Sequence, residues 1–347
     1  MRHVKTALTA AGLVAALALP LSAQESYRLD GRQVAIYNLA GQVEVVPGSG
    51  SQVVVTVTAG GADASRLSVE VGEIRGRTAL RVVYPDDRIV YRRDGGGRYQ
   101  ASVRVRSDGT FGGGMGGDQV QIRSSGSGLE AHADLRVEVP AGTAVSLHNA
   151  VGAAEARGIR GDLVLAVNSG PIRVSDITGN VELDTGSGSV WAQGIRGALE
   201  VDTGSGSIDL ADVEGDHVLL DTGSGGVEAR SIRTGRLEVD TGSGGVELMD
   251  VSAPEVTVDT GSGSVQLDLM GSVETLEVDT GSGSVTARLR GGVNAQIEVD
   301  TGSGGIDVDF PVEVQTMRRN YFRGRAGNGD GRISIDTGSG SVRLLGG

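Results

Sequence analysis

The sequence predicts an all-β chain that folds as a single-stranded β-solenoid (β-helix) of about ten short coils, with a repeat of about 19 residues and irregular strands at its N-terminal end. Two observations lead to this prediction. The pentapeptide Asp-Thr-Gly-Ser-Gly occurs eight times at a nearly fixed spacing, and apolar residues alternate with polar ones on both sides of every copy. Such alternation is typical of a strand with one buried face. A single unit has nowhere to bury that face, so the units must stack.

The eight copies define one structural unit. They begin at Asp184, Asp202, Asp221, Asp240, Asp259, Asp279, Asp300 and Asp336, with spacings of 18, 19, 19, 19, 20, 21 and 36 residues. Each unit consists of a strand, a Gly-Ser-Gly bend and a second strand, and the two glycines are expected to supply backbone angles that side chains forbid. A further apolar residue follows several of the second strands, as at Ile195 and Val213, and predicts a third, looser side of the coil.

Residues 1–23 have the features of an export signal. Arg2 and Lys5 precede an apolar run, and Leu21-Ser22-Ala23 provides a small-residue cleavage site. No later stretch is long and apolar enough for a membrane helix, so we predict no membrane span. The chain is therefore expected to be exported to the periplasm, the cell surface or the extracellular medium.

The rest of the chain divides into two regions. Residues 24–145 form an N-terminal β region, and its Gly-rich excursion at 88–128 is expected to carry short strands at 101–105 and 120–122 between poorly ordered loops. Residues 146–347 form the regular β-solenoid, with an insertion at 315–331 that explains the spacing of 36 residues. Residues 34–45 repeat the same pattern in a degenerate form and predict an outlying first coil.

Charge limits the class of partner. The formal net charge is −13, and it becomes −15 once the signal, with Arg2 and Lys5, is removed. A chain this acidic is not expected to bind nucleic acid or anionic membranes, which are bound through basic patches. The positions predicted to face outward on the two strands are often acidic: Glu182, Glu200, Glu238, Glu277 and Glu298 on the first strand, and Asp209, Glu228, Glu247 and Asp307 on the second.

Three segments carry a resemblance to a known family. They are the opening Val34-Ala-Ile-Tyr-Asn-Leu-Ala-Gly-Gln-Val-Glu-Val45, the step Val137-Glu-Val-Pro-Ala-Gly142, and Arg323-Gly-Arg-Ala-Gly-Asn-Gly-Asp-Gly331 before a final coil. With the serial short coils, this order of parts resembles the exported bacterial family called putative adhesins, a domain of unknown function (DUF4097-like). The resemblance implies a β-solenoid and, by the family's name, adhesion. It transfers no functional residues.

The repeated motif also resembles the local signature of aspartic proteases. That chemistry needs two carboxylates face to face that share one proton. Stacked coils would instead align all eight aspartates in one row, so we predict no catalytic residues, no enzymatic activity and no cofactor. A carbohydrate-active solenoid enzyme is the alternative, and its acid, base or metal groups would lie in a groove without following the repeat.

The row of aspartates requires its own explanation. Adjacent strands lie ~4.8 Å apart, and like charges at about that distance repel by roughly 1 kcal/mol in a watery dielectric. The favoured interpretation is that each carboxylate accepts hydrogen bonds from N–H groups of its own turn. The alternative is a weak calcium ladder along the eight aspartates, since calcium binds several oxygens. Thr185 and its equivalents alternate with the aspartates and are expected to point toward the interior or the corner.

A few single residues stand outside the repeat. Trp191 is expected to face solvent, where it could contact a ligand by stacking on a sugar ring. His132, His148 and His217 lack the spacing of a metal site. The basic and aromatic segment at 318–325 is expected to fold back onto the acidic solenoid. The leading functional hypothesis is a non-catalytic exported protein for adhesion or structural binding through a repeated acidic face, with an unidentified surface protein or glycan as partner.

Overall fold

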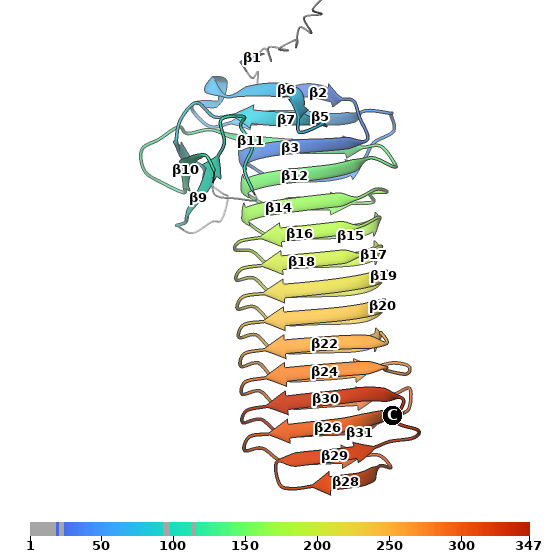
Figure 1. Ribbon diagram of the computed structural model, residues 1–347. Helices are drawn as coiled ribbons and strands as arrows, with labels where there is room; N and C mark the ends of the chain where they lie inside the picture. Colours follow the sequence, from blue (N-terminus) through green and yellow to red (C-terminus); the bar gives the residue numbers. More distant parts are fainter. Residues whose placement is uncertain (1–18, 21–23, 93–97, 113–115) are drawn as a thin grey trace, which may run out of the picture.

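The computed structural model describes residues 19–20, 24–92, 98–112 and 116–347. Figure 1 shows a tall stack in which the strands lie across the long axis, from the blue N-terminal end to the red C-terminal end. Apart from one short 3-10 turn, η1 (Ala64–Arg66), the elements of the described chain are strands. The predicted all-β, solenoid-like architecture is therefore confirmed.

Each coil contributes one strand to each of two sheets. In spatial order, the first sheet contains β1 (Leu19–Pro20), β6 (Ser68–Ile74), β7 (Arg77–Val83), β3 (Gln33–Ala40), β12 (Ala144–Val151), β14 (Leu163–Ser169), β16 (Val181–Thr185), β18 (Leu199–Thr203), the ends of β19 (Ile208–Thr222) and β20 (Val227–Thr241), β22 (Glu255–Thr260), β24 (Thr275–Thr280), β30 (Gly331–Thr337), β26 (Ala295–Thr301), β29 (Tyr321–Arg325) and β28 (Glu313–Met317). The second sheet contains β2 (Gln24–Leu29), β5 (Val53–Gly60), β11 (His132–Val139), β4 (Val43–Pro47), β13 (Ala154–Arg157), β15 (Ile172–Thr178), β17 (Val190–Arg196), the beginnings of β19 and β20, β21 (Val246–Ser252), β23 (Val265–Leu269), β25 (Val285–Leu289), β31 (Val342–Gly346) and β27 (Ile306–Asp309).

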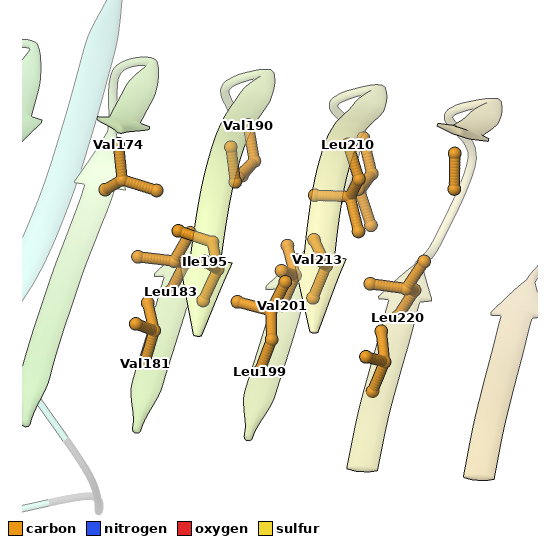
Figure 2. Packing of buried hydrophobic residues seen from close by; sticks show 14 of the residues in the cluster. Val174, Val181, Leu183, Val190, Ile195, Leu199, Val201, Leu210, Val213 and Leu220 are labelled. Carbon is orange, nitrogen blue, oxygen red and sulfur yellow. The ribbon is translucent and has the colours of Figure 1, made fainter. Parts of the chain in front are cut away.

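The core is a continuous column between the two sheets. Strands of successive coils pair in parallel and without offset, so that Leu183 lies beside Val201 and Val190 beside Ile208. These side chains are buried, and Figure 2 shows Leu183, Val190 and Val201 in the stack of core residues. Full burial of a Val or Leu side chain stabilises a fold by roughly 1.5–3 kcal/mol. The repeated alternation therefore supplies the stability that no single coil has.

The predicted third apolar position also joins the core. Ile195 and Val213 are buried although each follows the previous inward residue by three positions instead of two. A residue with a left-handed backbone absorbs the extra position: Gly194 in one coil, at φ 67°, and Asp212 in the next, at φ 56°. Aspartate is among the few non-glycine residues that tolerate this conformation. The bend turns the strand toward the corner that leads to the next coil.

The N-terminal end follows the degenerate pattern predicted for residues 34–45. Ile36 of β3 pairs with Leu147 of β12, and Val43 of β4 pairs with Ala154 of β13, so this segment forms a coil on top of the regular stack. The antiparallel strands β2 and β5 then extend the second sheet, and β6 extends the first. Most of the predicted signal lies outside the described residues, and Leu19–Pro20 pairs with β6.

The excursion forms a small separate sheet. Its strands are β8 (Arg88–Val90), β10 (Asp118–Arg123) and β9 (Gln100–Val105), and the predicted strands at 101–105 and 120–122 are confirmed. Buried Tyr91 and Phe111 belong to an apolar cluster that joins this sheet to Leu39 and Val151 of the first coils. Parts of the predicted loops, residues 93–97 and 113–115, lie outside the described residues.

The C-terminal coils are not stacked in chain order. Strand β30 pairs with β24 on one side and with β26 on the other, and β31 lies in the same way between β25 and β27 (Figure 1). The last coil of the sequence is therefore inserted between the two coils that precede it. The order of the layers therefore differs from the order of the repeats in the sequence. The coil at 331–346 carries the same turn and inward residues as its neighbours, so Asp336 fits between Asp279 and Asp300 in one register.

Candidate functional site

The turns are held by threonine. The Thr241 hydroxyl donates to the carbonyl oxygen of Gly225, one layer earlier, at 2.8 Å and accepts the Gly244 N–H of its own turn at 3.0 Å. The equivalent threonines make the same donor contact at 2.8–3.1 Å: Thr185, Thr203, Thr222, Thr260, Thr280 and Thr337. Each of these side chains is fully buried, as expected from the alternation. The threonine column therefore ties each layer to the next.

This arrangement corrects the role predicted for the aspartates. The turn N–H that the carboxylates were expected to accept is taken by the threonine hydroxyl in the same turn, as Gly206 with Thr203 shows at 3.0 Å. The aspartate lies one position earlier on the strand, so its side chain points to the opposite side of the sheet. The turn is complete without it.

The turn glycines also serve a different purpose from the predicted one. Left-handed backbone angles are absent from the glycines of the described Thr-Gly-Ser-Gly turns. A Cβ added to Gly244 would instead lie 1.8 Å from the Gly225 carbonyl oxygen of the preceding layer. Close approach of stacked backbones therefore requires glycine at this position.

The aspartates form a single exposed column on the outer face of the first sheet. Strand pairing places Asp184, Asp202, Asp221, Asp240, Asp259, Asp279, Asp336 and Asp300 side by side in that order. Within the described residues, no hydrogen bond or ion pair reaches their carboxylates. Partial burial and then the charges of Asp221 and Asp259 raise the pKa of Asp240, and the same causes act on Asp279, whose neighbours are Asp259 and Asp336.

A second, interrupted column of glutamates runs parallel to the first, and Leu219, Thr257 and Ser334 occupy the intervening layers. Glu182, Glu200, Glu238, Glu277 and Glu298 stand two residues before their aspartates and face the same way. We call the surface made by these five glutamates and the eight aspartates the acidic face. Two outward acids of the second sheet are paired, since Asp209 lies 3.6 Å from Arg230 and Asp307 lies 3.5 Å from Arg343. In the acidic face, Glu238 pairs with Arg236.

The aspartate column is bounded by different residues at its two ends. Toward the N-terminal end, the same outward column continues as Ala166, His148 and Tyr37. Toward the C-terminal end, β29 runs antiparallel to β26, and the Tyr321 hydroxyl donates to Glu298 at 3.0 Å. The prediction that the basic segment folds back onto the solenoid is confirmed.

A hollow lies where the excursion meets the upper end of the aspartate column. Its volume is about 350 Å³, and Arg104, His148 and Asp184 are among its lining residues. His148 stacks on Tyr37 with ring centroids 4.7 Å apart. Burial, with the nearby charges of Arg106 and Arg77, lowers the pKa of His148 to about 4, so this ring is neutral at neutral pH.

The strand register also bears on the protease resemblance and on the alternative of a calcium ladder. All eight aspartates lie in one column, and no two of them face each other across a cleft. Among the described residues, no group of three or more His, Cys, Asp or Glu side chains is arranged to hold a metal ion. His132, His148 and His217 lie on different strands, β11, β12 and β19.

Trp191 lies outside the acidic face. It stands on the outer side of β17 in the second sheet, half-buried and directly beside Arg173 of β15. The two residues line a shallow hollow of about 180 Å³ together with Glu44, Glu155, Arg157 and Ser175. Sequence reasoning singled out Trp191 alone, because the other lining residues are separated from it by many positions in the chain.

Stacked coils joined by in-register turns define a protein of the β-solenoid class. The chain belongs to the Toastrack DUF4097 family, whose model matches residues 161–345. A comparison with curated proteins found no match. A crystal structure of a "putative cell adhesion protein" from Clostridium sporogenes aligns with 93% of this chain and 99% of its own length, at 10% sequence identity and a TM-score of 0.20. A similarity this low supports no conclusion about function.

The described part of the chain contains no helix with the length and hydrophobicity needed to cross a lipid bilayer.

Proposed function

We propose that this chain is a non-catalytic binding protein that acts in adhesion or as a structural component of the cell envelope through its acidic face. The column of eight aspartates, which have no hydrogen-bond or ion-pair partner within the described residues, supports this proposal most directly. Stacking places like charges on adjacent strands, where each neighbour costs roughly 1 kcal/mol in a watery dielectric. A cationic partner would offset this repulsion along the whole column. Eight layers in one register would repeat the same contact many times.

The partner we propose is a surface protein or glycan that presents several amino or guanidinium groups. Single exposed ion pairs contribute only about 0–1 kcal/mol each. Several linked contacts raise the overall affinity because, after the first, each further contact forms within one complex. The acidic face is suited to this mode, since its aspartates repeat on eight successive layers.

Two observations favour binding over catalysis. The carboxylates follow the repeat, whereas a catalytic pair needs two groups held in different environments. In addition, the threonine hydroxyls that resemble part of a protease motif are fully buried and hydrogen-bonded to the backbone of their own turn and of the preceding layer, as at Thr203. The Asp-Thr-Gly-Ser motif is therefore explained by the construction of the stack.

The proposal is tested by binding of the purified protein to immobilised polylysine at increasing salt concentration. The test variant changes Asp221, Asp240 and Asp259 to Asn. The matched control changes Asp209, Glu228 and Glu247 to their amides, which removes the same charge from the second sheet. We expect the test variant to lose about tenfold or more in affinity, and the control to lose much less. Equal losses would show that net charge, and not the acidic face, is responsible.

We also propose that the chain is exported to the periplasm, the cell surface or the medium after removal of residues 1–23. Mass spectrometry of the protein recovered from the producing cell should then find a mature N-terminus at Gln24. Recovery of an uncleaved chain from the cytoplasm would contradict export.

A further inference from the structure

The outer face of the second sheet contains a trough that is separate from the acidic face. Its floor and walls come from four adjacent strands: β4, β13, β15 and β17. Glu44 on β4 accepts a hydrogen bond from Arg157 at 2.8 Å and also pairs with Arg136, so its charge is neutralised. At the other end stands Trp191, the single tryptophan of the sequence.

Between these ends lie polar groups without partners. Strand pairing sets Glu155 of β13 beside Arg173 of β15, and Arg173 beside Trp191. Within the described residues, neither the Glu155 nor the Arg173 side chain has a hydrogen bond or an ion pair. Ser175 adds a hydroxyl two residues from Arg173. The trough thus presents a free acceptor, a free donor and a half-exposed indole within three adjacent strands.

We propose that this trough binds one pyranose ring of a saccharide. A sugar ring has an apolar face that can cover the indole, and its rim carries hydroxyls that both donate and accept hydrogen bonds. Glu155 is the acceptor for such a hydroxyl, and Arg173 and Ser175 provide donors. A small number of polar groups beside an aromatic surface is typical of a small-ligand site. This site does not depend on the acidic face, because it lies on the other sheet.

Tryptophan fluorescence offers a direct test, since Trp191 is the only tryptophan and its emission reports on this trough. The purified protein is titrated with a neutral oligosaccharide, cellohexaose, and with an acidic one, hexagalacturonate. We expect a saturable change in emission with at least one of them at millimolar or lower concentration. Saturation with the neutral sugar would assign recognition to hydroxyls, whereas saturation with the acidic sugar alone would assign the sugar carboxylate to Arg173.

Three variants test whether the trough is responsible. Arg173→Gln should weaken binding about tenfold by loss of a charged donor. Arg233→Gln, which removes an exposed arginine from another part of the stack, should leave the affinity unchanged. Trp191→Val should abolish binding in calorimetry, where the fluorophore is not needed, and should keep the melting temperature because Trp191 lies outside the buried core. Absence of saturation with both sugars, or equal affinity of Arg173→Gln and the unchanged protein, would overturn the proposal.

Discussion

The Thr241 hydroxyl donates to the carbonyl oxygen of Gly225, one layer earlier, at 2.8 Å, in the buried interior of the turn. We predict that Thr241→Val lowers the free energy of unfolding by about 2 kcal/mol, because a buried carbonyl and the Gly244 N–H both lose their partner. Valine fits sterically, since Val167 occupies the same column. Urea unfolding provides the measurement. Thr241→Ser should retain most of the stability, and exposed Ser243→Ala should have no effect beyond about 0.5 kcal/mol. An unchanged free energy of unfolding in Thr241→Val would contradict this role of the hydroxyl.

Two adjacent glycines should respond differently to the same substitution. Gly244→Ala would place a Cβ 1.8 Å from the Gly225 carbonyl oxygen, so the layers must separate. We expect a loss of about 3 kcal/mol or more, or an insoluble protein. Gly245→Ala meets its nearest atom, the Ser264 carbonyl oxygen, at 3.4 Å and should be tolerated. Melting temperatures compare the two variants, and equal values would count against close stacking as the reason for glycine.

The aspartate column should make stability depend on pH. The pKa of Asp240 is raised above its ordinary value of 3.8, so the folded state retains its proton more readily than the unfolded state. The contribution of Asp240 to the free energy of unfolding therefore falls as pH rises through its folded pKa, and it returns when the pH is lowered again. The variant with Asn at positions 221, 240 and 259 should lack this contribution. Melting temperatures of the two proteins should differ more at pH 7 than near pH 4, with the variant more stable at pH 7.

The opposite dependence of stability on pH is expected from Asp268. Arg290 donates to its two carboxylate oxygens at 2.6 and 2.5 Å, and these hydrogen bonds lower the pKa of Asp268. The pair therefore stabilises the fold above the ordinary carboxyl pKa, and this stabilisation disappears as pH falls through the lowered value. Asp268→Asn should destabilise the protein at pH 7 and have progressively less effect in acid. An effect that is constant across this range would exclude a contribution from the ionised pair.

Calcium should have little influence on the folded state. The aspartates lie in one line and, among the described residues, no group of acids is arranged to hold a metal ion. We expect millimolar calcium to shift the melting temperature only slightly. A large stabilisation that disappears when Asp221, Asp240 and Asp259 are changed to Asn would revive the calcium ladder.

Removal of one whole coil should be tolerated. Deletion of residues 226–244 joins Gly225 to Gly245 and restores a complete turn, so every remaining layer keeps its pairing register. Deletion of residues 226–235 alone removes one strand of a coil and the corner after it, and should expose core residues such as Leu237. We expect a soluble β-rich protein from the first deletion and aggregation from the second, as measured by circular dichroism and size-exclusion chromatography. Equal aggregation of the two deletion variants would contradict a stack in which each layer depends only on its neighbours.

The parts of the structure that depend on local pattern could be predicted from the sequence. Alternation fixes which residues of β16 and β18 face inward, and it placed Thr185 inside and Asp184 outside. The role of Asp184 in the turn was predicted wrongly, because the Thr185 hydroxyl makes the contact that holds the turn to Gly170 of another coil, and local pattern carries no information about that contact. The trough beside Trp191 could not be predicted for the same reason, since Glu44 reaches it from the first coil.

The order of the last coils was beyond sequence reasoning for a different reason. Residues 295–309 and 331–346 carry equivalent inward residues and equivalent turns, so either coil can pair with β24 and β25. Identical repeats specify how layers stack but not which layer comes next. The antiparallel pairing of β29 with β26 places that coil at the end, and it leaves the inner position to the last segment.

The inserted coil separates the order of synthesis from the order of assembly. A stack that grew in chain order would add the coil at 331–346 after the coil at 295–309, but here residues 331–346 form the layer between that coil and the coil at 275–289. These layers therefore close only after residues 331–346 have been made. A chain that is cut short after the β28–β29 hairpin lacks an interior layer, so the closure of the core depends on the segment that follows the hairpin.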